Sequence, residues 1–168
     1  IDILSGTSTL VGAGPLFVYF GSCSGPHVTP SKVLRSGTPV ANALFGFSVT
    51  GGNVIGDNRN DIIVGAPGES YSASVGGLPS TATVTAGKVY VIRGEDMATA
   101  NPSPFLSLYL NGSAFFNSGV IGVVGSNTSI NALFGFSVAV TDDMNGDGLD
   151  DIVIGAPGYA ELGLLPVR

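Results

Sequence analysis

The chain repeats an eight-residue segment letter for letter, and this duplication constrains its fold more than any other feature. The segment Asn-Ala-Leu-Phe-Gly-Phe-Ser-Val occupies residues 42–49 and returns at residues 131–138, 89 positions later. A second segment, Asp-Ile-Ile-Val-Gly-Ala-Pro-Gly at 61–68, returns at 151–158 with two conservative changes. Self-similarity at a nearly fixed spacing is the sequence signature of repeat architectures. We therefore expect two copies of one structural unit.

The repeated segments predict β-strands. Phe-Gly-Phe-Ser-Val alternates large and small side chains, which is typical of a strand with one crowded face. The β-branched run at 152–154 suits a strand that is buried on both faces. Residues 14–21 and 87–94 also resemble each other and are strand-like, and no window of 11 residues shows a helical period. An all-β fold with propeller-type blades follows, because the alternative, an immunoglobulin-like sandwich, leaves the repeat unexplained.

Composition and charge exclude two classes of function. The 168 residues carry a net charge of -6, and only 6 of them are Lys or Arg. No basic stripe is therefore available to neutralise phosphates, which argues against a nucleic-acid partner. The sequence contains no run of 18 apolar residues, so we expect no membrane insertion by this segment. With 44% hydrophobic residues, the chain has enough apolar content for a globular core.

The order of the motifs resembles a known family. Phe-Gly-Phe-Ser-Val, an acidic loop and Asp-Ile-Val-Ile-Gly-Ala-Pro follow one another twice, as in the FG-GAP repeats of integrin α-subunit β-propellers. The resemblance implies four-stranded blades, of which this chain contains about two to three. Since that number does not close a ring, we expect residues 1–168 to be part of a larger or multi-chain propeller. The repeat cores would span 43–68 and 132–158, with a partial repeat at 2–21 and inserted loops at 69–86 and 97–130.

An acidic loop lies between two predicted strands of the second repeat. Five of the 12 acidic residues fall within residues 142–151, with oxygen-bearing side chains at the alternate positions 143, 145 and 147 and a glycine at 148. Such side chains converge when a short loop curls, and Ca²⁺ takes 6–8 oxygen ligands. Without a cation, crowded carboxylates repel one another. The loop therefore predicts a calcium site. Mg²⁺ is a less suitable ion, because it tolerates flexible cages of protein ligands poorly.

An EF-hand loop begins with the same spacing but requires a bidentate Glu at its twelfth position, where this chain has Ile154. The family resemblance implies a site between strands instead. An Asx-turn network without metal is the alternative interpretation of the same residues. By resemblance, the ligands would be the side chains of Asp143, Asn145, Asp147 and Asp151 together with the Leu149 carbonyl.

The equivalent loop of the first repeat, residues 53–61, is predicted to bind calcium weakly or not at all. Ile55 replaces an oxygen-bearing residue there, and Arg59 places a cation beside the site. Asp2 is interpreted as the end of a third such loop.

Other reactive residues do not form a recognisable catalytic set. His27 is the single histidine and Cys23 the single cysteine, so a triad or a zinc site lacks partners. The carboxylate pairs 142/143 and 150/151 resemble those of glycosidases, but calcium coordination explains their spacing more economically. We expect no enzyme activity. Asn111 and Asn127 begin Asn-x-Ser sequons and are candidate glycosylation sites.

These features together predict a calcium-stabilised extracellular or cell-surface module for adhesion or recognition, without catalysis. Its ligand would be a protein or a glycan that binds the inserted loops. Two alternatives stay open. One is a structural subunit of an extracellular assembly or filament that copies close by self-assembly through strand exchange. The other is a glycan-binding, lectin-type propeller.

Overall fold

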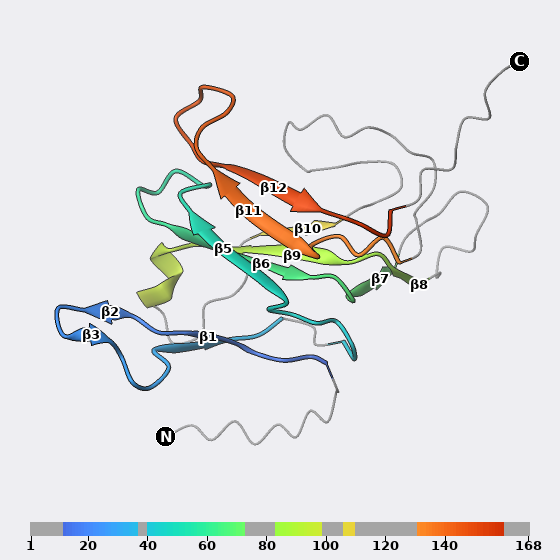
Figure 1. The fold of residues 1–168 in the computed structure, drawn as a ribbon, viewed down its shortest axis with the longest axis horizontal. Coiled ribbons are helices and arrows are strands. Elements are labelled where there is room, and N and C mark those ends of the chain that lie inside the picture. The colour runs from blue at the N-terminus through green and yellow to red at the C-terminus, as the bar shows by residue number, and fades with distance from the viewer. Residues whose placement is uncertain (1–11, 37–39, 73–82, 99–105, 110–130, 160–168) are drawn as a thin grey trace, which may run out of the picture.

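The computed structural model describes residues 12–36, 40–72, 83–98, 106–109 and 131–159, and within them the fold is built from β-strands (Figure 1). The strands are β1 (Leu16–Val18), β2 (Gly21–Ser22), β3 (Gly25–Pro26), β4 (Lys32–Leu34), β5 (Ser48–Gly52), β6 (Asp61–Ala66), β7 (Ser70–Ser72), β8 (Thr83–Thr85), β9 (Lys88–Ile92), β10 (Leu106–Tyr109), β11 (Ser137–Thr141) and β12 (Asp151–Gly155). One short 3₁₀ helix, η1, spans Glu95–Ala98. No helix in these ranges is long and apolar enough to cross a membrane.

A four-stranded antiparallel sheet forms the centre of the structure. Its strand order is β10-β9-β6-β5, with every neighbour antiparallel. The register pairs Ile63 of β6 with Val91 of β9 and Thr50 of β5. This meander is one complete blade of the kind that the repeat predicted.

Two-stranded sheets flank the central blade on either side. The hairpin of β11 and β12 repeats the sequence of β5 and β6, and β11 packs against β5. On the other side, β1 pairs with β4, and β1 carries the segment that resembles β9. The described residues therefore contain the later part of one blade, a whole blade and the first two strands of the next. Two small hairpins, β2-β3 and β7-β8, extend from this framework.

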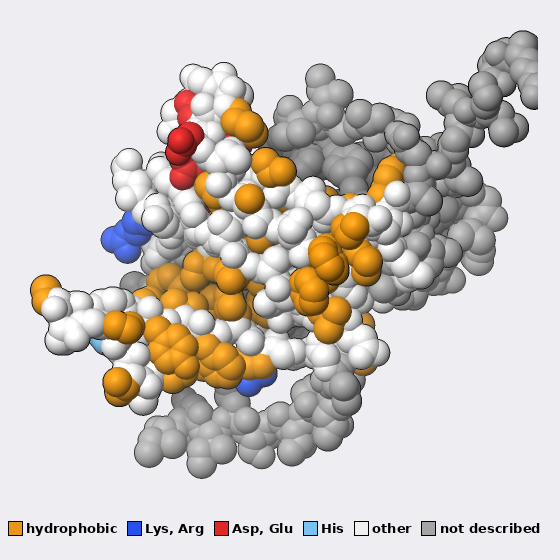
Figure 2. All heavy atoms as spheres, in the orientation of Figure 1, with side chains coloured by type: hydrophobic (Ala, Val, Ile, Leu, Met, Phe, Trp, Pro, Cys, Tyr) orange, Lys and Arg blue, Asp and Glu red, His pale blue; other side chains and the backbone are white. Residues whose placement is uncertain are grey.

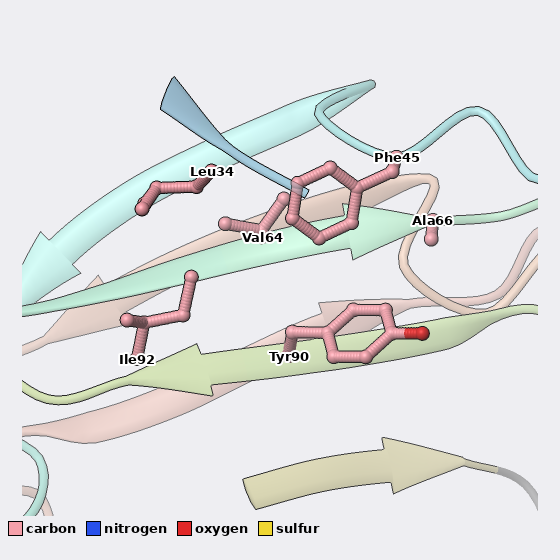
Figure 3. Packing of buried hydrophobic residues seen from close by; sticks show 6 residues of the cluster. All are labelled: Leu34, Phe45, Val64, Ala66, Tyr90 and Ile92. Carbon is pink, nitrogen blue, oxygen red and sulfur yellow. The ribbon is translucent and has the colours of Figure 1, made fainter. Parts of the chain in front are cut away.

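The first hydrophobic layer lies between the β1-β4 sheet and the central blade. Leu34 comes from β4, and β6 and β9 contribute side chains that alternate along each strand (Figure 3). The ring of Phe45 stands edge-on to that of Tyr90, with 5.3 Å between the ring centroids. Full burial of each large apolar side chain stabilises the fold by ~1.5–3 kcal/mol. The buried members of the layer are Leu34, Phe45, Val64, Ala66, Tyr90 and Ile92.

The second layer lies between the central blade and the β11-β12 hairpin. Ile63, Val89 and Val91 point to this side, so β6 and β9 are buried on both faces. Phe134 fills the layer as Phe45 fills the first one, 89 positions earlier. The first Phe of each Phe-Gly-Phe segment is thus an inter-blade wedge. The second is exposed, and the rings of Phe47 and Phe136 lie 4.9 Å apart.

The structure corrects two sequence-based expectations about the repeats. Phe-Gly-Phe is a turn rather than part of a strand, because Leu44 (φ 56°) and Gly46 (φ 86°) adopt the left-handed region and the strand begins at Ser48. The run 152–154 is not buried on both faces, since Val153 is 47% exposed whereas its counterpart Ile63 is fully buried. The difference arises because nothing among the described residues packs on the outer face of β12.

The stretches interpreted as inserted loops also contain strands. Residues 70–72 and 83–85 form the β7-β8 hairpin, and residues 106–109 form β10, the outer strand of the central blade. Turn-rich composition hid these strands, because an edge strand needs only a few pairing residues. Residues 73–82, 99–105 and 110–130 lie outside the described part of the chain.

Candidate metal centre

The acidic loop connects β11 to β12 at one end of their hairpin, where Thr141 and Asp151 are opposite partners. Figure 2 shows acidic side chains gathered over this protruding loop. Gly146 (φ 82°) and Gly148 (φ 89°) adopt left-handed conformations that favour glycine, and they allow the chain to curl tightly. The sequence therefore folds this segment into the compact loop that was predicted.

The Asp143 carboxylate holds the tight turn of the loop through three hydrogen bonds from backbone amides. One carboxylate oxygen of Asp143 accepts hydrogen bonds from the backbone amides of Gly146 (2.6 Å) and Asp147 (3.0 Å). The other oxygen accepts one from the amide of Gly148 at 2.7 Å. These bonds favour the ionised form, and the Gly148 amide contributes most to holding the pKa of Asp143 below its usual range.

The other predicted ligands also bond within the loop. Asn145 accepts from the Asp147 amide at 2.8 Å and donates to the Asp147 carboxylate at 3.0 Å. The Leu149 amide donates to Asp147 at 2.9 Å, and the Met144 amide donates to Asp151 at 2.6 Å. Each of these side chains accepts a hydrogen bond from a backbone amide of the loop. These bonds form the Asx-turn network that was the alternative interpretation of the same residues.

The loop supplies the right donor chemistry for a hard cation but does not present a closed cage. Within the described ranges, no three His, Cys, Asp or Glu side chains converge closely enough to hold a metal. The donors of the loop are nevertheless all oxygens, from three carboxylates and one amide, and these are the ligands that Ca²⁺ takes. A carboxylate has about four lone-pair sites. Asp143 Oδ1 uses both of its sites on the amides of Gly146 and Asp147. The Asp143, Asp147 and Asp151 oxygens that accept a single amide bond keep a site for an ion.

The structure assigns a different role to Asp150, which sequence reasoning had grouped with Asp151 as a carboxylate pair. Its carboxylate accepts a hydrogen bond from the backbone amide of Asn53 at 2.8 Å. In return, the Asp150 amide donates to the Asn53 carbonyl at 3.1 Å. Asn53 belongs to the equivalent loop of the first repeat, so this contact joins two blades. The sequence offered no signal for it beyond the expected adjacency of neighbouring repeats.

In the equivalent loop of the first repeat, residues 53–61, backbone amides bond the Asp61 carboxylate. Asp61 is fully buried, and its oxygens accept hydrogen bonds from the amides of Val54, Ile55 and Gly94 at 3.0–3.1 Å. Backbone amides therefore supply the positive partners of this carboxylate. One oxygen of Asp57 accepts from the Arg59 amide, and its other oxygen is buried and has no hydrogen-bond partner among the described residues. The weak or absent calcium binding of this loop stays a prediction.

A second buried polar cluster lies beside the first hydrophobic layer. Glu69 is 1% exposed, and one of its oxygens accepts from the Tyr90 hydroxyl at 2.5 Å and from the Lys88 ammonium at 3.0 Å. Its other oxygen has no hydrogen-bond partner within the described ranges. Burial, followed by the bond to Glu69, raises the pKa of Tyr90 well above its ordinary value. No pattern in the sequence pointed to this cluster.

The other candidate residues are accounted for individually. His27 contacts Ser31 at 3.0 Å in the β2-β3 hairpin region, and Cys23 is an exposed free thiol at the tip of that hairpin. Asn111, Asn127 and Asp2 lie outside the described residues. The two glycosylation candidates and the third acidic loop therefore stay predictions.

Comparison with known proteins identifies the family. Residues 134–165 match the FG-GAP repeat. Human integrin alpha-E is 28% identical over 151 residues, which cover 88% of this chain and 11% of that protein. Mouse phosphatidylinositol-glycan-specific phospholipase D is 31% identical, over 78% of this chain and 13% of its own length. Integrin alpha-5 of Xenopus laevis is 30% identical, over 71% of this chain and 8% of its own length.

The fold and the matched motif define an all-β protein built from propeller blades. The chain belongs to the FG-GAP repeat family, with the blades of the integrin α-like β-propeller. It spans only about a tenth of the length of the curated relatives that it matches.

Proposed function

We propose that this chain is a calcium-stabilised extracellular segment of an adhesion or recognition propeller and that it has no catalytic role. The similarity to two integrin α chains is the observation that carries the proposal. The module would act at the cell surface, where its loops would bind a protein or a glycan. The similarity to a phospholipase D makes catalysis the competing idea.

The donor set of the 142–151 loop supports a structural calcium ion. The ion would be held by Asp143, Asn145, Asp147, Asp151 and the Leu149 carbonyl. When bound, Ca²⁺ would supply the positive charge that offsets the repulsion between three carboxylates in one short loop. The residues of this chain do the remaining work, because the amides that bond Asp143 already pre-form the loop.

Calcium titration of the 168-residue chain tests this proposal. We expect calorimetry to show about one ion per chain and a rise in thermal stability on binding. Asp147→Asn should weaken binding strongly, whereas Asp142→Asn, an exposed acidic residue of the same loop outside the ligand set, should leave it nearly unchanged. Absence of binding by the unaltered chain, or equal effects of the two variants, would refute the site.

A further observation is compatible with the structural-subunit alternative. Phe17 is 51% exposed, whereas Tyr90, its counterpart in the central blade, is 3% exposed. Val153 is likewise exposed where Ile63 is buried. Hydrophobic side chains are visible around β1 in Figure 2. The outward faces of β1 and of β12 could therefore each pack against a further blade. That blade would come from the same polypeptide or from another copy.

The intact mass of the denatured, deglycosylated native polypeptide separates the two sources of that blade. A mass near 16.8 kDa would favour assembly between copies. A much larger mass would mean that further repeats of the same chain cover both faces, and the recognition proposal would stand alone.

A further inference from the structure

The acidic loop is hydrogen-bonded to the preceding repeat through Asp150, a residue between two of its predicted ion ligands. Asp150 lies between Leu149 and Asp151, and it forms the reciprocal pair of hydrogen bonds with the Asn53 backbone described above. The Asp150 carboxylate and the Asp150 amide both bond to main-chain atoms of Asn53. Together these bonds fix Asp150 relative to the neighbouring blade. The flanking Leu149 carbonyl and Asp151 carboxylate are positioned with it.

Packing around this pair is close on the side of the first repeat. A Cβ atom on Gly52 would lie 2.8 Å from the Asp150 carboxylate and 2.4 Å from Val140, so glycine is needed to admit both side chains. A Cβ on Gly56 would lie 3.0 Å from the Leu149 side chain. Leu149 and Asp150 are therefore both seated on the 52–56 segment of the first repeat.

We propose that Asp150 is a positioning residue that couples ion binding in the 142–151 loop to the contact between the two repeats. Asp150 does not ligate the ion; it holds the loop against the backbone of Asn53. This inference rests on the proposed calcium site. Coupling of two binding events is reciprocal, so an ion that orders the loop also strengthens the inter-repeat contact, and the contact strengthens ion binding.

The coupling predicts an effect on a residue that is not an ion ligand. In amide hydrogen exchange of the unaltered 168-residue chain, added Ca²⁺ should slow exchange at the Asn53 amide, which donates to Asp150. Exchange at the Arg59 amide, which bonds only inside its own loop to Asp57, serves as the internal reference and should change little. Equal exchange at Asn53 with and without bound Ca²⁺ would overturn the inference.

Variants of Asp150 complete the test with Ca²⁺ as the probe. Asp150→Ala should lower calcium affinity by about fivefold or more, the usual lower range for coupled sites, and should speed exchange at Asn53. Asp150→Asn keeps an acceptor oxygen and should recover most of both effects. Asp142→Ala removes the same charge from the same loop and is the matched control, for which neither property should change.

The outcomes distinguish the inference from the calcium site itself. If the unaltered chain binds no Ca²⁺, the calcium site and the coupling are both refuted. If it binds Ca²⁺ and Asp150→Ala binds equally well, the site stands and the coupling is wrong. If Asp142→Ala weakens binding as much as Asp150→Ala, the effect is one of net charge, and the positioning role is again overturned.

Discussion

Substitution of Gly65 by alanine should separate the contact between blades from the local structure of the motif. Gly65 is the first residue of Gly-Ala-Pro in the first repeat, and a Cβ there would lie 2.1 Å from the carbonyl oxygen of Gly135 and 2.2 Å from the Ser48 hydroxyl. Gly155 holds the same place in the second repeat. A Cβ on Gly155 meets the Ser137 hydroxyl at 2.4 Å, with its next contact at 3.7 Å.

The two sites therefore differ chiefly in one backbone oxygen. The Ser137 hydroxyl can rotate away from a Cβ on Gly155. The Ser48 hydroxyl, by contrast, donates a hydrogen bond to the Gly135 carbonyl at 2.7 Å, and that carbonyl is part of the next blade and can move only with it. Overpacking of this kind costs about 1–3 kcal/mol. The gain of about 0.4–1 kcal/mol from restricting the unfolded chain is the same for both Gly→Ala substitutions, so it cancels in their comparison. We expect Gly65→Ala to be less stable than Gly155→Ala by about 2 kcal/mol.

Urea unfolding of the 168-residue chain, followed by circular dichroism, measures this difference. With a slope of about 2 kcal/mol per molar urea, the midpoints of the two variants should differ by about 1 M. Equal midpoints, or a greater loss for Gly155→Ala, would show that the approach of Gly135 to Gly65 does not limit the packing of the blades.

Two further predictions concern the buried cluster around Glu69. Lys88→Met leaves the Glu69 carboxylate buried without its cation and should cost about 3 kcal/mol in urea unfolding, whereas the double variant with Glu69→Gln should recover most of the loss. The raised pKa of Tyr90 means that the unfolded chain releases the phenolic proton at about pH 10 while the folded chain keeps it. This stabilisation is complete below pH ~10 and is lost progressively as the pH rises above that value. Stability should therefore fall more steeply above pH ~10 in the parent than in Tyr90→Phe. Parallel curves would contradict the assignment.

Sequence reasoning recovered the repeating part of the fold because repeated packing leaves a repeated pattern. The two copies of the Gly-Ala-Pro segment form β6 and β12, and the resemblance between 14–21 and 87–94 corresponds to β1 and β9. The boundary at Ser48 was missed, because the left-handed conformation of Leu44 is imposed by a turn that packs between blades. The edge strand β10 was missed because its few pairing residues lie outside the repeated segments.

The candidate site was predictable in composition but not in its connections. The spacing of Asp143 and Asp147 correctly indicated a tight loop of oxygen donors, since Asx residues bond the amides that follow them. The attachment of Asp150 to Asn53 joins residues that are 97 positions apart. A single sequence contains no information on such a contact until the arrangement of the blades is known. Glu69 was missed for the same reason, because its partners come from β9.

The contact between successive Phe-Gly and Gly-Ala-Pro segments has a polarity. Gly135 of the later repeat rests on Gly65 of the earlier one, and the two surfaces involved are different from each other. A contact of this heterologous kind cannot pair two identical blades around a twofold axis. Every added blade must enter in the same direction, so any structure built through this contact either turns back to its beginning as a ring or continues as an open helix. The close approach of Gly135 to Gly65 thus gives such an assembly a direction of growth.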